Sequence, residues 1–249
     1  RAGLSPHSPF SAGASLIKDV GELASELRGK GRRTPVAIHV AETEAELLLL
    51  ASQEGPLVTF LQELGAWDAR ELVPGPDFIV ACFDNYGAPP LLLIHANYLM
   101  ALPAARDGRD IPVVYCPRTH HAFGHPPHPF RAFQLGGTSV ALGTDSLASN
   151  PDLDVLAEAR FVHALAPDVP MDVLLGMATL TGAKALQWDN VTGSVTPGKS
   201  ADLVILPLPD TEPTDPHSLV LESSLSIKAV VFRGALTFAT DKGVAGMWW

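Results

Sequence analysis

Val140-Ala-Leu-Gly-Thr-Asp-Ser-Leu-Ala-Ser-Asn150 is the stretch of this sequence that indicates the fold most directly. Its first five residues are small or apolar, as in a buried strand, and they lead straight to Asp145. Ser146, Ser149 and Asn150 then indicate a loop and a helix cap. We therefore expect the Asp145 carboxylate at the carboxyl end of a strand, where α/β folds place their functional groups. One alternative stays open, because an Asp after a strand is often only the N-cap of the next helix.

The same pattern, an apolar strand that ends in polar side chains, occurs twice earlier in the chain. Pro35-Val-Ala-Ile-His-Val-Ala-Glu42 carries His39 and Glu42, and Leu91-Leu-Leu-Ile-His-Ala96 carries His95. Another strand is expected at 111–117, and helical periodicity is found at 16–28, 44–54, 57–64, 153–165 and 171–186. Because strands alternate with helices, the pattern predicts a parallel sheet and the α/β class.

The sequence changes character near residues 187–192. From Gly193 onward, Pro and Gly separate short apolar runs, which is typical of a small β domain. We therefore expect two domains, at 1–189 and 190–249.

Composition limits the classes of function. The 249 residues are 47% hydrophobic and 18% charged, which indicates a globular protein. The net charge of −10 and the lack of a long basic run argue against a nucleic-acid partner. Cys82 and Cys116 form no disulfide framework, so we expect a cytoplasmic protein. No apolar run approaches the roughly 20 residues that cross a bilayer, so we expect no membrane association.

Three polar side chains are expected to meet at one edge of the sheet. A single His at a strand end is usually structural, but His39, His95 and Asp145 converge if the sheet curls into a barrel. Neutral imidazole together with carboxylate suits a divalent ion such as Zn²⁺. Glu42 is near enough to His39 in the sequence to act as an acid or base in the same pocket.

Several of these motifs resemble those of the amidohydrolase superfamily. His39-Val-Ala-Glu42, Ile94-His-Ala96 and 142–150 resemble its motifs after strands five, six and eight, and Pro6-His-Ser-Pro-Phe-Ser11 is similar to its strand-four motif. Residues 192–205 resemble its return into a β-sandwich. The branch in question holds adenosine, S-adenosylhomocysteine, guanine and aminofutalosine deaminases and triazine hydrolases.

The resemblance implies a fold and an activity. The fold is strands four to eight of a TIM-type (β/α)8 barrel at 1–189, a metal-dependent hydrolase portion, with part of a β-sandwich at 190–249. The activity is a metal-dependent deamination of a nitrogen heterocycle, such as a purine nucleoside derivative, by attack of metal-bound hydroxide on a ring carbon. A cyclic amide or triazine hydrolase is the alternative enzyme, and a non-catalytic binding homologue is the alternative of another class.

The resemblance also implies roles for individual residues. His39 and Asp145 would hold one divalent metal, Zn²⁺ or alternatively Fe²⁺. In catalysis, Asp145 would take a proton from the attacking water, His95 would contact that water or the intermediate, and Glu42 would protonate the leaving nitrogen. The implied substrate-binding residues are His7, Arg118, His120 and Ser146. For Arg118 a simple pairing with a neighbouring acid stays open.

Two departures from the family pattern matter. The family has a His-x-His ligand pair at its first strand, and no His-x-His occurs in this sequence. We therefore expect an N-terminal half with this pair, on another chain or upstream; a homo-oligomer is an open alternative. Thr119-His120 replace a Ser-Asn of the family in the histidine-rich loop 118–129, so substrate contacts there should differ. A second metal site or a plain surface loop are the alternatives for this segment.

Overall fold

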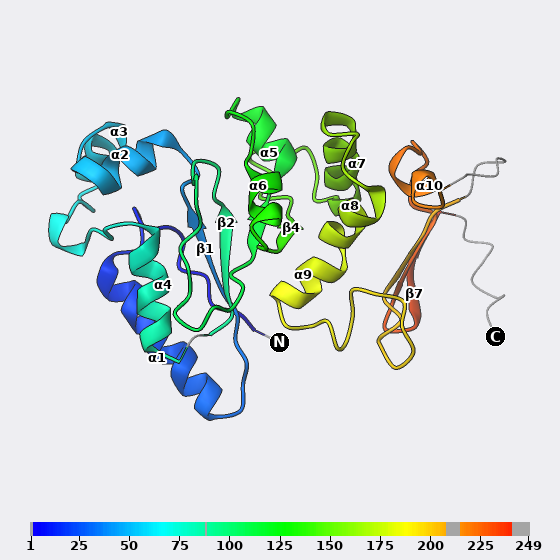
Figure 1. Cartoon of the computed structure of the whole chain (residues 1–249), viewed down its shortest axis with the longest axis horizontal. Helices are drawn as coiled ribbons and strands as arrows, with labels where there is room; N and C mark the ends of the chain where they lie inside the picture. The colour runs from blue at the N-terminus through cyan, green and yellow to red at the C-terminus, as the bar shows by residue number, and fades with distance from the viewer. Residues whose placement is uncertain (1, 88, 208–214, 241–249) are drawn as a thin grey trace.

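The centre of the protein is a four-stranded parallel sheet with the strand order β1-β2-β3-β4 (Figure 1). The computed structural model describes residues 2–87, 89–207 and 215–240. The strands are β1 (Val36–Val40), β2 (Leu91–His95), β3 (Val113–Tyr115) and β4 (Val140–Leu142). Leu4 adds one parallel bridge to Val36, beyond β1. The predicted α/β class with a parallel sheet is confirmed.

Burial along β1 explains which way its side chains point. Val36, Ile38 and Val40 are buried, whereas Ala37 and His39 are only partly covered. Successive side chains of a strand point to opposite faces, so one face of β1 packs in the core and the other carries His39.

In Figure 1 helices lie to the left and to the right of the row of strands. On the side of β1 lie α1 (Ala14–Gly29) and α4 (Pro76–Asn85), and on the side of β4 lie α7 (Val155–Leu165), α8 (Met171–Ala178) and α9 (Leu180–Ala185). The remaining helices are α2 (Glu44–Ser52), α3 (Pro56–Glu63), the 3₁₀ helix η1 (Ala69–Glu71), α5 (Pro117–Ala122), α6 (Phe130–Leu135) and α10 (Ser218–Leu221). The core joins α1, α4 and α8 to the strands through side chains such as Ile17, Phe83 and Leu174.

The prediction of a single helix at 171–186 was wrong, because the segment forms two helices, α8 and α9. Thr179 separates them with φ −134° and ψ −88°, which is not helical. Its hydroxyl donates to the Leu175 carbonyl at 2.6 Å, and such a bond back to residue i−4 competes with the helix. The loop expected at 118–129 also begins as the short helix α5, whose first residue is Pro117.

A second, antiparallel sheet contains β5 (Leu203–Ile205), β6 (Ala229–Phe232) and β7 (Ala235–Ala239). Short strands were expected in this part of the chain. The Arg160 side chain of α7 donates to the carbonyls of Val220 and Leu225, which ties the segment before β6 to the larger body. The predicted boundary between 1–189 and 190–249 stays a prediction, and 208–214 and 241–249 lie outside the described residues.

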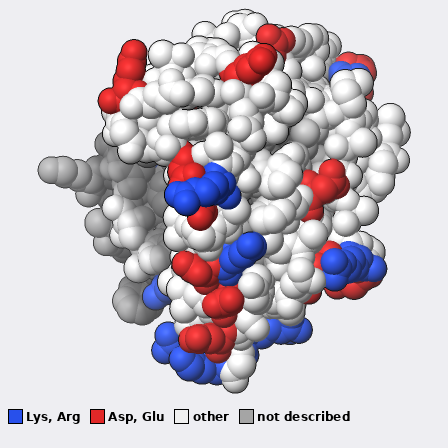
Figure 2. All heavy atoms as spheres, turned by 90° about the vertical axis from the view of Figure 1, so that its left-hand side faces the viewer, with Lys and Arg blue, Asp and Glu red and all other residues white. Residues whose placement is uncertain are grey.

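The surface formed on the side of α1 to α4 carries charges of both signs. Figure 2 shows Asp and Glu interspersed with Lys and Arg over this face, with basic groups at its lower end. Among the described residues, no helix has the length and apolarity that a membrane span requires.

Candidate functional site

The structure brings together one side chain from each of three strand ends. His39 lies in β1, His95 is the last residue of β2, and Asp145 follows β4 by three residues. One donor atom from each of the three lies within 4.8 Å of the other two. The ring centroids of His39 and His95 are 5.3 Å apart. Parallel strands explain this convergence, because their carboxyl ends meet at one edge.

The backbone leaves the regular strand geometry at these ends. Ala41, His95, Ala96 and Asp145 all have positive φ, between 49° and 68°. His95 pairs in register with Val40, whose side chain lies in the core, so a regular strand would place both on the same face. The φ of +68° takes the His95 imidazole out of this alternation and towards His39. Left-handed non-glycine residues cost free energy and are found most often at functional sites.

The two imidazoles each have a ring nitrogen that is available to a ligand. Nδ1 of His39 lies 2.8 Å from the His7 carbonyl oxygen, so Nδ1–H donates and Nε2 keeps its lone pair. Nε2 of His95 is buried and has no hydrogen-bond partner among the described residues. Burial, reinforced by the nearby His39, lowers the pKa of His95 to about 4, so its ring is neutral at pH 7.

Hydrogen bonds hold Asp145 from the following loop. Ser149 Oγ donates to Asp145 Oδ2 at 3.0 Å, and Asn150 Nδ2 donates to the Thr144 carbonyl at 2.6 Å. The other carboxylate oxygen of Asp145 accepts no side-chain hydrogen bond from the described part of the chain. An orphaned imidazole nitrogen, a second imidazole of fixed tautomer and a carboxylate therefore form a donor set that fits a divalent ion such as Zn²⁺.

Glu42 lies beside this cluster, with Oε1 3.7 Å from His95 Nε2. Burial raises the pKa of Glu42; the nearby His39 works against this shift, and Asp145 adds to it. A carboxyl that keeps its proton to higher pH is suited to proton transfer near neutrality.

Glu46 is a residue that the sequence analysis missed. Its carboxyl is buried, and it accepts hydrogen bonds from the backbone N–H of Ala41 at 2.8 Å and of Glu42 at 3.0 Å. Burial raises the pKa of Glu46 to about 7. Thr43-x-x-Glu46 is a capping-box pattern, and Thr43 Oγ1 accepts from the Glu46 N–H at 3.2 Å. The capping-box pattern could have drawn attention to Glu46 in the sequence. In a capping box the Glu side chain accepts from the N-cap N–H, whereas here it accepts from the N–H groups of Ala41 and Glu42.

The four predicted substrate-binding residues have different surroundings. His7 is exposed, with its ring centroid 5.2 Å from that of His39, and burial together with His39 lowers its pKa. Ser146 is exposed next to Asp145. The guanidinium of Arg118 forms ion pairs with Asp152 and Glu158, which is the alternative left open from the sequence. His120 is buried.

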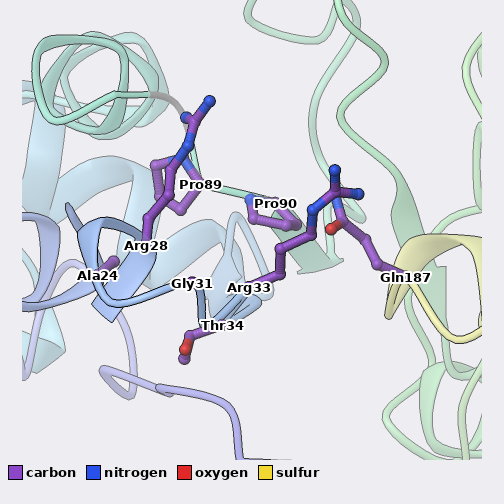
Figure 3. Close-up of a pocket in the computed structure, with 8 residues that line it drawn as sticks. All are labelled: Ala24, Arg28, Gly31, Arg33, Thr34, Pro89, Pro90 and Gln187. Carbon is purple, nitrogen blue, oxygen red and sulfur yellow. The ribbon is translucent and has the colours of Figure 1, made fainter. Parts of the chain in front are cut away.

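Two cavities lie away from this cluster. Their volumes are about 370 and 550 Å³, and both are lined by Gly31, Arg33 and Thr34. Figure 3 shows the one of about 370 Å³. Thr34 lies two residues before β1 and Pro90 lies directly before β2, so these cavities lie at the amino ends of the strands. The cluster lies at the carboxyl ends.

Comparison with known proteins gives matches over most of the chain. Residues 1–237 match the Amidohydrolase family. A 5-methylthioadenosine/S-adenosylhomocysteine deaminase of Thermoanaerobacter pseudethanolicus is 30% identical over 86% of this chain and 46% of its own length. An aminodeoxyfutalosine deaminase of Deinococcus radiodurans is 34% identical over 75% of this chain and 45% of its own length. The chain therefore spans about half the length of these curated relatives.

Solved structures agree on the fold. An adenosine deaminase from Xanthomonas campestris with bound zinc superposes with a TM-score of 0.69 at 25% identity, over 95% of this chain and 52% of that one. The aminofutalosine deaminase of Helicobacter pylori in complex with methylthio-coformycin gives a TM-score of 0.77 at 21% identity, over 96% of this chain and 58% of that one.

Proposed function

The chain belongs to the amidohydrolase family, and from this premise we propose that it carries the site of a metal-dependent aminohydrolase. The proposed substrate is a nitrogen heterocycle such as a purine nucleoside derivative, which loses an amino group as ammonia. The observation that carries the proposal is the convergence of His39, His95 and Asp145 beside Glu42. The relatives named above as deaminases support the choice of reaction.

One divalent ion is part of the proposal. His39 and Asp145 are the proposed ligands, His95 lies in the same donor set, and Zn²⁺ or Fe²⁺ fits these atoms. When bound, such an ion lowers the pKa of water towards about 7 and so supplies a nucleophile at neutral pH. The zinc in the adenosine deaminase of Xanthomonas campestris supports zinc here.

In the proposed reaction, some residues of this chain transfer protons and others contact the substrate. The Asp145 carboxylate accepts a proton from the attacking water, and Glu42, whose raised pKa suits proton transfer, delivers one to the leaving nitrogen. Neutral His95 presents its unpartnered Nε2 to the reacting atoms. His7 and Ser146, which flank the cluster, are the proposed substrate contacts from the described residues.

The same proposal covers the wider architecture. The segment around Leu4, which bridges to β1, is proposed to be strand four of a (β/α)8 barrel, and β1 to β4 are proposed to be its strands five to eight, in a domain at 1–189. β5 to β7 are proposed to be part of a β-sandwich at 190–249. Zinc in proteins usually has four ligands, so the donor group of His39, His95 and Asp145 leaves the coordination of an ion incomplete. A His-x-His pair on a segment outside this sequence, which would supply further ligands, stays a prediction. A cytoplasmic location, a small-molecule substrate without a nucleic-acid partner, and homo-oligomerisation also stay predictions.

The test is ammonia release by the protein as it occurs in its source cell, with aminopurine nucleosides, pterins and triazines as substrates. We expect turnover with a purine nucleoside derivative and its loss in Asp145→Ala. The control is Asp168→Ala, because Asp168 is an exposed acid paired with Arg131. Dechlorination of a triazine without ammonia release would favour the alternative enzyme. Turnover that is unchanged in Asp145→Ala would overturn the proposed site.

A further inference from the structure

The histidine-rich segment 118–129 contains two buried imidazoles that the proposed reaction does not use. His120 is 6% exposed and His128 is 8% exposed, whereas His121 in the same segment is exposed. A buried imidazole is costly unless its polar atoms have partners. The partners of these two rings therefore indicate what the segment does.

His128 contacts the backbone of His95. Its Nε2 lies 2.7 Å from the His95 carbonyl oxygen, and because a carbonyl only accepts, Nε2–H is the donor. The ring of His128 stacks on Tyr115 of β3, with centroids 4.0 Å apart and planes 21° apart. The stack fixes the plane of the ring, and the hydrogen bond fixes its tautomer. Burial lowers the pKa of His128 to about 3, so the ring stays neutral.

The carbonyl that His128 holds belongs to the residue whose backbone is strained. His95 has φ +68°, and this rotation directs its imidazole towards His39. A left-handed residue persists only when surrounding contacts determine its geometry. The hydrogen bond from His128 is one of these contacts, because it holds the His95 carbonyl, which belongs to the peptide bond between His95 and Ala96.

Asn97 makes the corresponding contact to the other turn. Its Nδ2 donates to the Glu42 carbonyl at 3.0 Å, and its Oδ1 lies 3.1 Å from His120 Nδ1. Asn97 is 8% exposed, so its amide has little access to competing water. The Pro126 carbonyl lies 2.8 Å from His120 Nε2, and because burial lowers the pKa of His120, its neutral ring has a single N–H to donate, either to Pro126 or to Asn97 Oδ1. The same loop therefore reaches the strand-end turns of both β1 and β2.

We propose that the histidine-rich segment is a positioning element, in which His128 holds the His95 turn, while Asn97, beside which His120 lies, holds the Glu42 turn. The effect of this positioning on catalysis rests on the proposed function, since the two turns carry His95 and Glu42 of the proposed site. In this proposal His120 and His128 are positioning residues and not substrate contacts. They act through the peptide groups of His95 and Glu42.

The test compares two substitutions at one position. His128→Phe keeps a ring that stacks on Tyr115 but removes the donor, and His128→Gln restores a side-chain N–H donor. His121→Phe is the matched control, because His121 is an exposed neighbour in the same segment whose ring packs against Phe161. Correct folding of each variant is checked by urea unfolding.

Two readouts separate positioning from general stability. The first is the ¹⁵N–¹H spectrum of the histidine rings without metal, in which His128→Phe should shift the His95 signals. The second is the affinity for added Zn²⁺. It should fall about 10-fold in His128→Phe, the lower end of the effect of losing a contact that orients a metal site, because His95 lies in the same donor group as the proposed ligands His39 and Asp145. His128→Gln should restore most of the affinity, and His121→Phe should change neither readout.

Each outcome decides the proposal. Unshifted His95 signals with unchanged zinc affinity in folded His128→Phe would overturn it. If His128→Phe does not fold, the unaltered protein decides, because an Nε2–H tautomer of His128 with slow proton exchange supports the proposal and an Nδ1–H tautomer contradicts it. If the unaltered protein binds no zinc, the proposed function fails, while the shift of His95 still tests the positioning role.

Discussion

Arg118 is predicted to stabilise the fold, and its replacement by Met tests this role. Its Nε donates to Glu158 Oε1 at 2.6 Å, and its backbone N–H donates to Oε2 of the same carboxylate at 2.9 Å. Glu158 is 0% exposed and also accepts from Asn150 Nδ2 at 2.6 Å. Asp152 binds the outer side of the guanidinium. Arg118→Met would leave a buried carboxylate without its counter-ion.

The expected loss follows from the burial of the pair. Removing one partner of a buried ion pair costs about 3–5 kcal/mol, because a charge is left unpaired in the interior. Arg131 pairs with Asp168 through Nη1 and Nη2, as Arg118 does with Asp152, but the Arg131 and Asp168 side chains are 45% and 69% exposed. An exposed pair contributes about 0–1 kcal/mol, so Arg131→Met is the matched control.

The assay is equilibrium unfolding in urea at pH 7, with the free energy of unfolding extrapolated to water. Arg118→Met should lose at least ~2 kcal/mol more than Arg131→Met. The double variant Arg118→Met/Glu158→Leu should recover part of the loss, because it removes the unpaired charge. Equal losses in the two single variants would refute the reasoning. A specific rise in KM for an anionic substrate without loss of stability would return Arg118 to the substrate-binding role.

Two further predictions concern Glu46 in the first turn of α2 and Gly193 in the loop after α9. The Glu46 pKa of about 7 lies above its ordinary 4.5, so the folded state binds more protons than the unfolded state between these values, and this group's contribution to stability falls as pH rises from 4.5 to 7. The fall is up to about 3 kcal/mol, and Glu46→Gln should remove it from a plot of unfolding free energy against pH; an unchanged slope would contradict the assignment. Gly193 has φ +86°, and an added Cβ would lie 2.5 Å from the Ala183 Cβ and 3.1 Å from the Leu180 Cα, so Gly193→Ala should lower the melting temperature more than Gly198→Ala. Gly198 has φ +88° with open space around it, so equal shifts would mean that crowding at Gly193 is absent.

The sequence predicted the elements that place the site, because their signals are local. Apolar runs that end in His39, His95 and Asp145 mark strands whatever the rest of the chain does, and the parallel order follows from the helices between them. The division at Thr179 was not predicted, since apolar periodicity continues across it and only the hydroxyl bond to Leu175 reveals the break.

The contacts that hold the site in place could not be predicted, because they join residues that are far apart in the chain. Arg118 meets Glu158 across 40 residues, and His128 meets the His95 carbonyl across 33. Neither contact leaves a periodic signal. For Arg118 the sequence left two readings open, a substrate anion or a neighbouring acid, and only the folded arrangement shows Glu158 in contact with it.

The most direct test of the proposed metal site is the binding of Zn²⁺ to the protein, measured by calorimetry and metal analysis. We expect one ion per chain in the unaltered protein and its loss in both His39→Ala and Asp145→Ala. The control is His217→Ala, because His217 also pairs with an acid, Asp215, and is partly exposed away from the cluster. Zinc bound equally well by all four proteins, or by none of them, would contradict the account.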